Sequence, residues 1–69
     1  MNESIEQTAG RNVRSLREQQ HLSKTAFCLM AGVSRPYLNK IEAGQANMSI
    51  KQLDRLAKAL GTDVISLLR

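Results

Sequence analysis

Residues 22–44 decide the fold, and they read LSKTAFCLMAGVSRPYLNKIEAG. We interpret this stretch as two short helices joined by a tight turn at 31–34. Gly32 suits the left-handed residue that ends the first helix, and Ser34 can cap the second helix by accepting from a free N–H. Pro36 falls in the first turn of the second helix, where a missing N–H costs little.

The second of these helices, residues 35–42, has two different faces. On a helical wheel of about 100° per residue, Tyr37, Leu38 and Ile41 share an arc that can be buried. The opposing arc of roughly 140° projects charged and amide groups outward. Its residues are Arg35, Pro36, Asn39 and Lys40.

A DNA major groove accepts a helix with such a polar arc. Arg35 can donate a fork to guanine O6 and N7, and Asn39 can pair with adenine. Lys40 can reach guanine or phosphate, whereas Pro36 can only pack, for instance on a thymine methyl group. The sequence therefore indicates four base-reading residues, with an ordinary exposed polar helix as the alternative.

Short motifs flank this stretch at a regular spacing. They are Leu16-Arg17, Leu22-Ser23, Ala31-Gly32-Val33-Ser34, Ile41-Glu42 with Gly44, Asn47 with Ser49, and Leu56-Ala57-Lys58-Ala59-Leu60-Gly61. In this order they resemble the Cro and cI repressor family, also called the XRE family, over residues 13–68. The resemblance implies an all-α fold, a compact five-helix lambda-repressor-like DNA-binding domain whose helix-turn-helix is formed by the second and third helices.

We expect one domain over residues 1–69, with helices at about 4–20, 24–31, 35–42, 50–60 and 64–68. Ser4-x-x-Gln7 and Ser49-x-x-Gln52 are capping boxes that open the first and fourth helices. Gly10 weakens the first helix by roughly 1 kcal/mol relative to alanine, and its missing side chain can let another backbone come close. Apolar residues at helical spacing predict core positions: Ile5, Ala9, Val13, Leu16, Ile50, Leu53, Leu56, Ala57, Leu60, and two or three of Val64, Ile65, Leu67 and Leu68. The resemblance implies that Phe27, Cys28 and Ala31 also point inward, because they stand at core positions of the family.

The resemblance also implies roles for residues outside the base-reading arc. Arg17 should form a structural ion pair with Glu42. We expect contacts to DNA phosphates from Lys24, Ser34, Tyr37 and Asn47. For Lys24, which stands where the family often has glutamine, an ordinary exposed lysine is the alternative. For Arg11 and Arg14 a solvated surface is favoured over phosphate contact.

Some residues depart from the family pattern. Leu29 and Met30 stand where the family usually has polar residues. One of them can complete the core, and the other can add to an exposed apolar patch that would bind a partner. Between these roles, a place in the core is slightly favoured over the exposed patch. Met48 replaces the usual proline, which should make its loop less rigid. Ile65 also replaces a polar residue, and with Val64 and Leu68 it forms our candidate dimer interface.

Composition limits the alternatives. The formal net charge of +4 and a pI near 9.9 favour a polyanionic partner such as nucleic acid, although an anionic membrane surface also fits. No apolar run is long enough to span a bilayer. A lone Cys28 excludes an internal disulfide and fits a reducing cytosol, and with one histidine, His21, no zinc cluster is expected.

We therefore expect a transcriptional regulator that binds double-stranded DNA sequence-specifically, without cofactor or metal, in the cytoplasm and on the nucleoid. It should be a homodimer with half-sites about 34 Å apart on a palindromic operator. An enzyme is not expected, because no base–nucleophile pair or phosphate-binding glycine loop is present. The alternative is an antitoxin-like protein-interaction module with secondary DNA binding, motivated by Leu29, Met30 and Ile65.

Overall fold

A computed structural model describes residues 3–69, and within this range the chain forms five helices and no strand. The expected all-α five-helix class is confirmed. The helices are α1 (Ile5–Gln19), α2 (Lys24–Ala31), α3 (Arg35–Glu42), α4 (Ile50–Ala59) and α5 (Val64–Leu67). Four of the expected helix ends were one residue too long. The residues concerned are caps that lie just outside the helices: Ser4, Gln20, Leu60 and Leu68.

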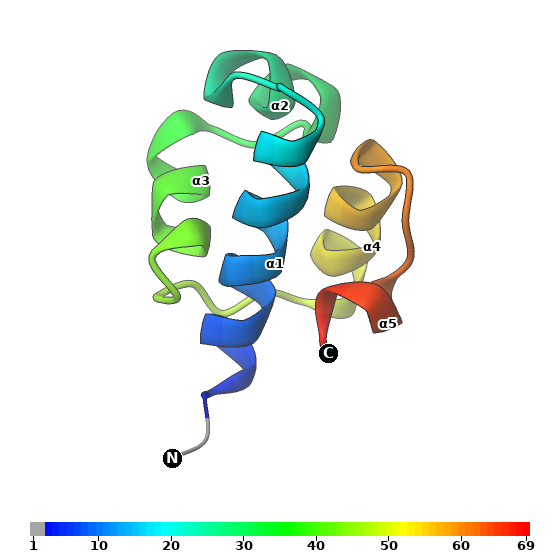
Figure 1. Ribbon diagram of the computed structural model, residues 1–69. Helices are drawn as coiled ribbons and strands as arrows, with labels where there is room; N and C mark the ends of the chain where they lie inside the picture. Colours follow the sequence, from blue (N-terminus) through cyan, green and yellow to red (C-terminus); the bar gives the residue numbers. More distant parts are fainter. Residues whose placement is uncertain (1–2) are drawn as a thin grey trace.

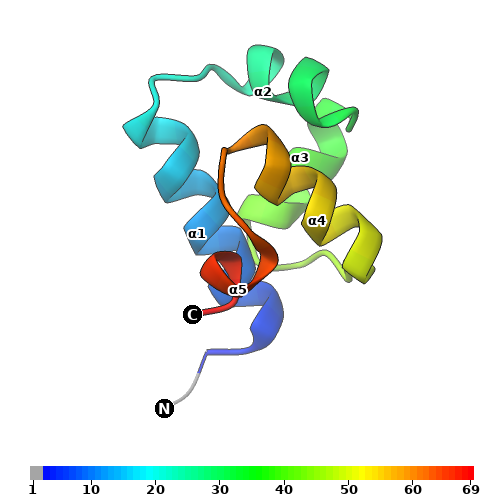
Figure 2. The same ribbon diagram turned by 90° about the vertical axis from the view of Figure 1, so that its right-hand side faces the viewer.

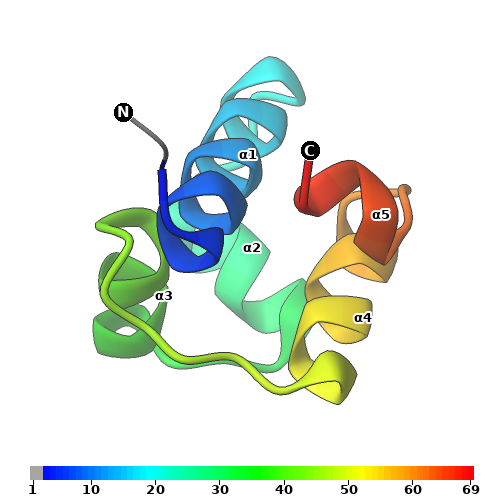
Figure 3. The same cartoon turned by 90° about the horizontal axis from the view of Figure 1, so that it is seen from below.

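Helix α1 lies in the middle of the molecule, with α3 on one side and α4 and α5 on the other (Figure 1). Helix α2 crosses one end of this arrangement and packs against both α3 and α4 (Figure 2). The segment between α3 and α4 runs across the opposite end, from one side of the molecule to the other (Figure 3). This arrangement leaves one long face of α3 without a neighbouring helix.

Serine residues begin the first four helices. The hydroxyls of Ser4, Ser23, Ser34 and Ser49 each accept a hydrogen bond from an N–H in the first turn. Both predicted capping boxes are present, since the side-chain oxygens of Gln7 and Gln52 accept from the backbone N–H of the capping serine. These local bonds explain why the helix starts were readable from sequence.

Two glycines determine how α2 and α1 meet α3. Gly32 ends α2 with a φ of 69°, and its N–H donates to the Cys28 carbonyl over 2.9 Å. Gly10 allows close contact between backbones, because a Cβ there would overlap the carbonyl oxygen of Ile41 and lie 3.3 Å from the Gly44 nitrogen. The close approach expected from Gly10 is therefore present.

The core joins all five helices. The largest fully buried side chains are Phe27, Leu38, Ile41, Leu56, Leu67 and Val13. From α5 only Leu67 is fully buried, and Val64 packs against the core beside it. Two residues of that helix therefore close the core, as the sequence indicated.

Four apolar residues were placed in the core wrongly or doubtfully. Ile5 and Ile50 are exposed, because each is the first residue of its helix and lies a turn beyond the neighbours that cover the rest of the stripe. Leu29 and Met30 are both exposed, at 81% and 54%, so the slight preference for surplus core was wrong. The buried face of α2 is already filled by Phe27, Cys28 and Ala31, and it faces α3 and α4.

Candidate nucleic-acid interface

Helix α3 separates its side chains as the wheel predicted. Leu38 and Ile41 are fully buried, and Tyr37 is half-buried. The four predicted base-reading residues are all exposed: Arg35, Pro36, Asn39 and Lys40. The helix is therefore fixed to the core by one side while the other side presents two cations and an amide.

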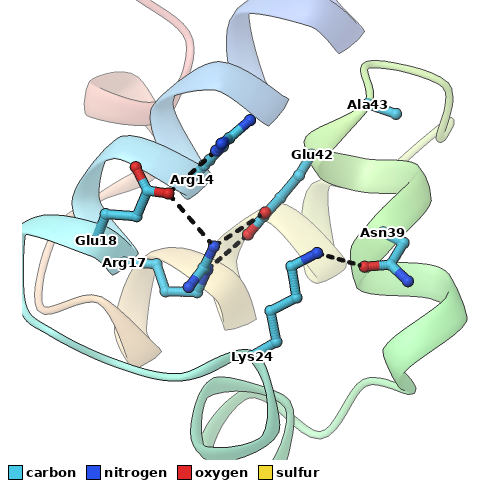
Figure 4. Close-up of a pocket in the computed structure, with 7 residues that line it drawn as sticks. All are labelled: Arg14, Arg17, Glu18, Lys24, Asn39, Glu42 and Ala43. Carbon is cyan, nitrogen blue, oxygen red and sulfur yellow. Dashed lines mark hydrogen bonds and ion pairs between the residues drawn. The ribbon is translucent and has the colours of Figure 1, made fainter.

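Two hydrogen bonds link the polar side of α3 to the first turn of α2. The Arg35 guanidinium donates through Nη1 to the Thr25 hydroxyl over 2.9 Å. The Lys24 ammonium donates to Asn39 Oδ1 over 2.8 Å (Figure 4). Two of the four predicted base-reading side chains are thus held by α2. The role of Thr25 was missed, since a contact between residues ten apart in different helices leaves no periodic signal.

The predicted phosphate-contacting residues differ in what they have free to donate. Ser34 accepts from the Tyr37 N–H, so its own hydroxyl hydrogen is available to an anion. The Tyr37 hydroxyl already donates to Gln52 Oε1 over 2.9 Å, so a phosphate contact from it requires exchange of that bond. Asn47 is exposed in the segment between α3 and α4. Gln52, which joins α3 to the start of α4, was recognised from sequence only as a capping residue.

Arg17 and Glu42 form a bidentate ion pair between α1 and α3. Arg17 Nε lies 2.8 Å from Glu42 Oε2, and Nη2 lies 3.2 Å from Oε1. The two side chains are only 9% and 7% exposed. Arg17 also donates to the Leu22 carbonyl, and hydrogen bonding to Glu42 raises the Arg17 pKa above its ordinary value. Arg17 therefore stays charged, and its two bonds to Glu42 tie the end of α3 to the central helix.

This ion pair lies against a hollow of about 430 Å³ beside α3. Figure 4 shows the Lys24 side chain crossing from α2 to Asn39 in this hollow. The remaining lining residues come from α1 and from the end of α3: Arg14, Arg17, Glu18, Glu42 and Ala43. Arg14 pairs with Glu18, which leaves Lys24 as the cation whose partner here is a neutral amide.

The two arginines with doubtful roles on α1 have acidic partners. Arg11 lies 2.8 Å from Glu3, and Arg14 lies 3.2 Å from Glu18. All four side chains are about half exposed, at 45–62%, which agrees with the favoured solvated surface.

The predicted dimer residues lie at the carboxyl end of the chain. Ile65 is 64% exposed, Leu68 is 38% exposed, and Val64 is half-buried against the core. Helix α5 packs against α1 and α4, and it lies on the opposite side of the molecule from α3 (Figure 3).

Residues 13–67 match the family described as helix-turn-helix. The chain belongs to this family. Among curated proteins it is 36% identical over 64 residues to the control protein C.SmaI of Serratia marcescens. The aligned region covers 93% of this chain and 76% of that protein. It is 33% identical over 57 residues to the immunity repressor protein of Bacillus phage phi105, covering 83% of this chain and 40% of the repressor.

A solved structure carries the same likeness. The restriction-modification controller protein C.AhdI from Aeromonas hydrophila superimposes with a TM-score of 0.84 and 31% identity, covering 90% of this chain and 94% of that one. The protein is thus a Cro/cI-type, XRE-family helix-turn-helix regulator that binds DNA and acts in transcription. No helix among residues 3–69 is long and apolar enough to cross a membrane.

Proposed function

We propose that this helix-turn-helix regulator reads a specific, two-fold symmetric DNA operator as a homodimer, with α3 in the major groove. Residues 1–69 act as one DNA-binding domain in this proposal. A regulator of this kind works where DNA is, on the nucleoid in the cytoplasm, and it requires no cofactor or metal. It regulates without being an enzyme.

The proposal rests on the separation of buried apolar and exposed polar side chains on opposite sides of α3. Its fully buried Leu38 and Ile41 fix the helix rotationally, so the exposed Arg35, Asn39 and Lys40 keep one orientation relative to the core. Side chains that specify a base need such fixed geometry, whereas a contact to the backbone alone does not. The hydrogen bond that Arg35 donates to Thr25 and the one that Asn39 accepts from Lys24 restrict these two side chains further.

Dimerisation is supported by one observation on the structure and by the usual geometry of regulators with this fold. Ile65 on α5 and Leu68 just after it are exposed apolar residues, and α5 lies on the opposite side of the molecule from α3. Relatives of this chain are named as a control protein, an immunity repressor and a restriction-modification controller. Regulators of this fold typically place two recognition helices about 34 Å apart, one turn of DNA.

Selection of bound duplexes from a random DNA library at near-physiological salt tests the proposal. We expect a palindrome with half-sites about one helical turn apart. Recovery of unrelated sequences leaves only backbone affinity and refutes specific reading.

Arg35→Ala then locates one base contact. We expect a loss of about 1–3 kcal/mol in binding free energy and relaxed preference at one position of the half-site. Lys58→Ala is the matched control, because it removes one exposed positive charge from α4. An equal loss on every sequence, as expected for the control, would remove Arg35 from the base-reading set.

A second candidate function is an antitoxin-like interaction module with secondary DNA binding. The observation that favours it is the exposure of Leu29 and Met30, side by side on α2. A stoichiometric protein partner that binds the wild type and is lost in the Leu29→Gln/Met30→Gln variant supports this function. Retention of the partner by the variant excludes this surface.

A further inference from the structure

We propose that Lys24, on α2, determines base specificity by fixing the orientation of the Asn39 carboxamide on α3. This inference rests on the proposed function, because it concerns how the same helix reads its operator. It gives Lys24 a positioning role that differs from contact with a phosphate, the role expected from sequence.

The contact that carries the inference joins two helices. Lys24 is the first residue of α2, and Asn39 lies in the second turn of α3. The ammonium donates to Asn39 Oδ1 over 2.8 Å, a short distance for an N–H to O bond (Figure 4).

The chemistry of lysine makes this bond directional. An ammonium has three donors and no acceptor, so only the oxygen of the carboxamide can face it. The Asn39 amide therefore cannot exchange its O and N positions without losing the bond. Figure 4 shows the Nδ2 group turned away from Lys24.

The surroundings explain why Lys24 binds an amide although a carboxylate lines the same hollow. Both oxygens of Glu42 already accept from Arg17, and both of those side chains are buried. Glu18, the other carboxylate of the hollow, lies 3.2 Å from Arg14. The neutral oxygen of Asn39 is the partner that remains for Lys24.

A fixed amide changes what α3 can read. With Oδ1 directed at Lys24, Asn39 offers its Nδ2 donors to the groove, and these suit acceptors such as guanine O6 and N7 or thymine O4. Paired recognition of adenine instead requires Nδ2 and Oδ1 to face the base together. We therefore expect Asn39 to favour an acceptor-rich base edge, whereas the sequence alone suggested adenine.

The test compares base preference at each half-site position for a set of variants. Lys24→Met retains a chain of similar length but removes the donor, and Lys24→Arg retains a charged donor. Asn39→Ala identifies the position that Asn39 reads. Lys58→Met is the matched control, since it removes an exposed lysine from α4. Thermal unfolding of each variant confirms that it is folded.

We expect Lys24→Met to change preference at the position that Asn39→Ala flattens, raising adenine relative to guanine by about tenfold. Lys24→Arg should retain the wild-type preference, and Lys58→Met should leave it unchanged. In the Asn39→Ala background, Lys24→Met should alter no further preference.

An equal loss of affinity on all sequences in Lys24→Met, with the preference intact, overturns the inference and leaves Lys24 a phosphate contact. A change at a position that Asn39 does not read overturns it as well. In both of these outcomes the wild-type protein still shows a base preference, so the proposed function stands and only this inference fails. A wild type with no preference instead overturns the proposed function and, with it, this inference.

Discussion

Single residues on α1 and α3 show how a DNA-facing helix is held from behind. Glu42 ends α3, and its carboxylate receives two hydrogen bonds from Arg17 in a nearly closed site. Arg17 also donates to the Leu22 carbonyl, which precedes α2. One guanidinium therefore joins the central helix to both parts of the helix-turn-helix.

Removing one partner of this pair should be costly. We expect Glu42→Ala to lower the free energy of unfolding by about 3–5 kcal/mol, because Arg17 would then be a buried charge without its carboxylate. Urea denaturation followed by circular dichroism measures this loss. Glu18→Ala is the control, since Glu18 is half-exposed and its pairs should contribute less than about 1 kcal/mol. Similar losses in the two variants would contradict a buried, stabilising pair.

The sequence predicted which residues of α3 face outward but not what holds them. Their periodicity is a local property, and it placed Arg35, Asn39 and Lys40 correctly. The partners Thr25 and Lys24 lie ten and fifteen residues from Arg35 and Asn39, and only the packing of α2 against α3 brings them together. The ion pair of Arg17 was predicted because family resemblance, not periodicity, pointed to it.

At the scale of helices, the contact of α1 with α3 depends on one missing side chain. We expect Gly10→Ala to destabilise the protein by about 1–3 kcal/mol, because the added Cβ would overlap the Ile41 carbonyl. This loss should exceed the gain of about 1 kcal/mol that alanine brings to a helix. Ser15→Ala, an exposed change in the same helix, should be nearly neutral or stabilising. Thermal unfolding would contradict the close packing if Gly10→Ala raised the melting temperature.

The short helix α5 should be sensitive to acid. Its cap is Asp63, whose carboxylate accepts from the Ser66 N–H, and this bond holds the pKa of Asp63 below its ordinary value of about 3.8. A carboxylate whose pKa is lowered by folding stabilises the folded chain at pH values above its pKa in the unfolded chain. This contribution disappears as the pH falls through the pKa of the folded state. We expect Asp63→Asn, which keeps an acceptor but does not titrate, to show a smaller fall in melting temperature below about pH 4. Equal pH dependence in the two proteins would exclude this cap as a source of acid sensitivity.

Helix boundaries were predictable, whereas the burial of some apolar residues was not. The difference is that caps depend on neighbours within one helical turn, while burial depends on helices far apart in the sequence. Capping serines and the glycine after α2 act within one turn, so the sequence shows them directly. Burial depends on which neighbour covers a face, and no helix covers Leu29, Ile5 or Ile50. Their exposure required the arrangement of all five helices.

At the scale of the whole molecule, positive charge and apolar surface lead to different expectations. The formal charge of +4 attracts DNA of any sequence, and this term weakens as salt rises. The strength of an association between apolar surfaces depends far less on this screening by salt. A variant that changes the apolar surface without changing charge can therefore separate dimerisation from DNA attraction.

Ile65→Gln is that variant. Because Ile65 is 64% exposed beside Leu68, we expect its loss to weaken the dimer by about tenfold or more, as measured by analytical ultracentrifugation. Affinity for a full palindrome should fall while affinity for a single half-site stays the same, since the charge of +4 and the polar face of α3 are unchanged. Leu29→Gln, which removes an even more exposed apolar residue from α2, should leave the dimer intact. The opposite pattern, a monomer from Leu29→Gln and a dimer from Ile65→Gln, would move the interface to α2 and require a different spacing of the two recognition helices.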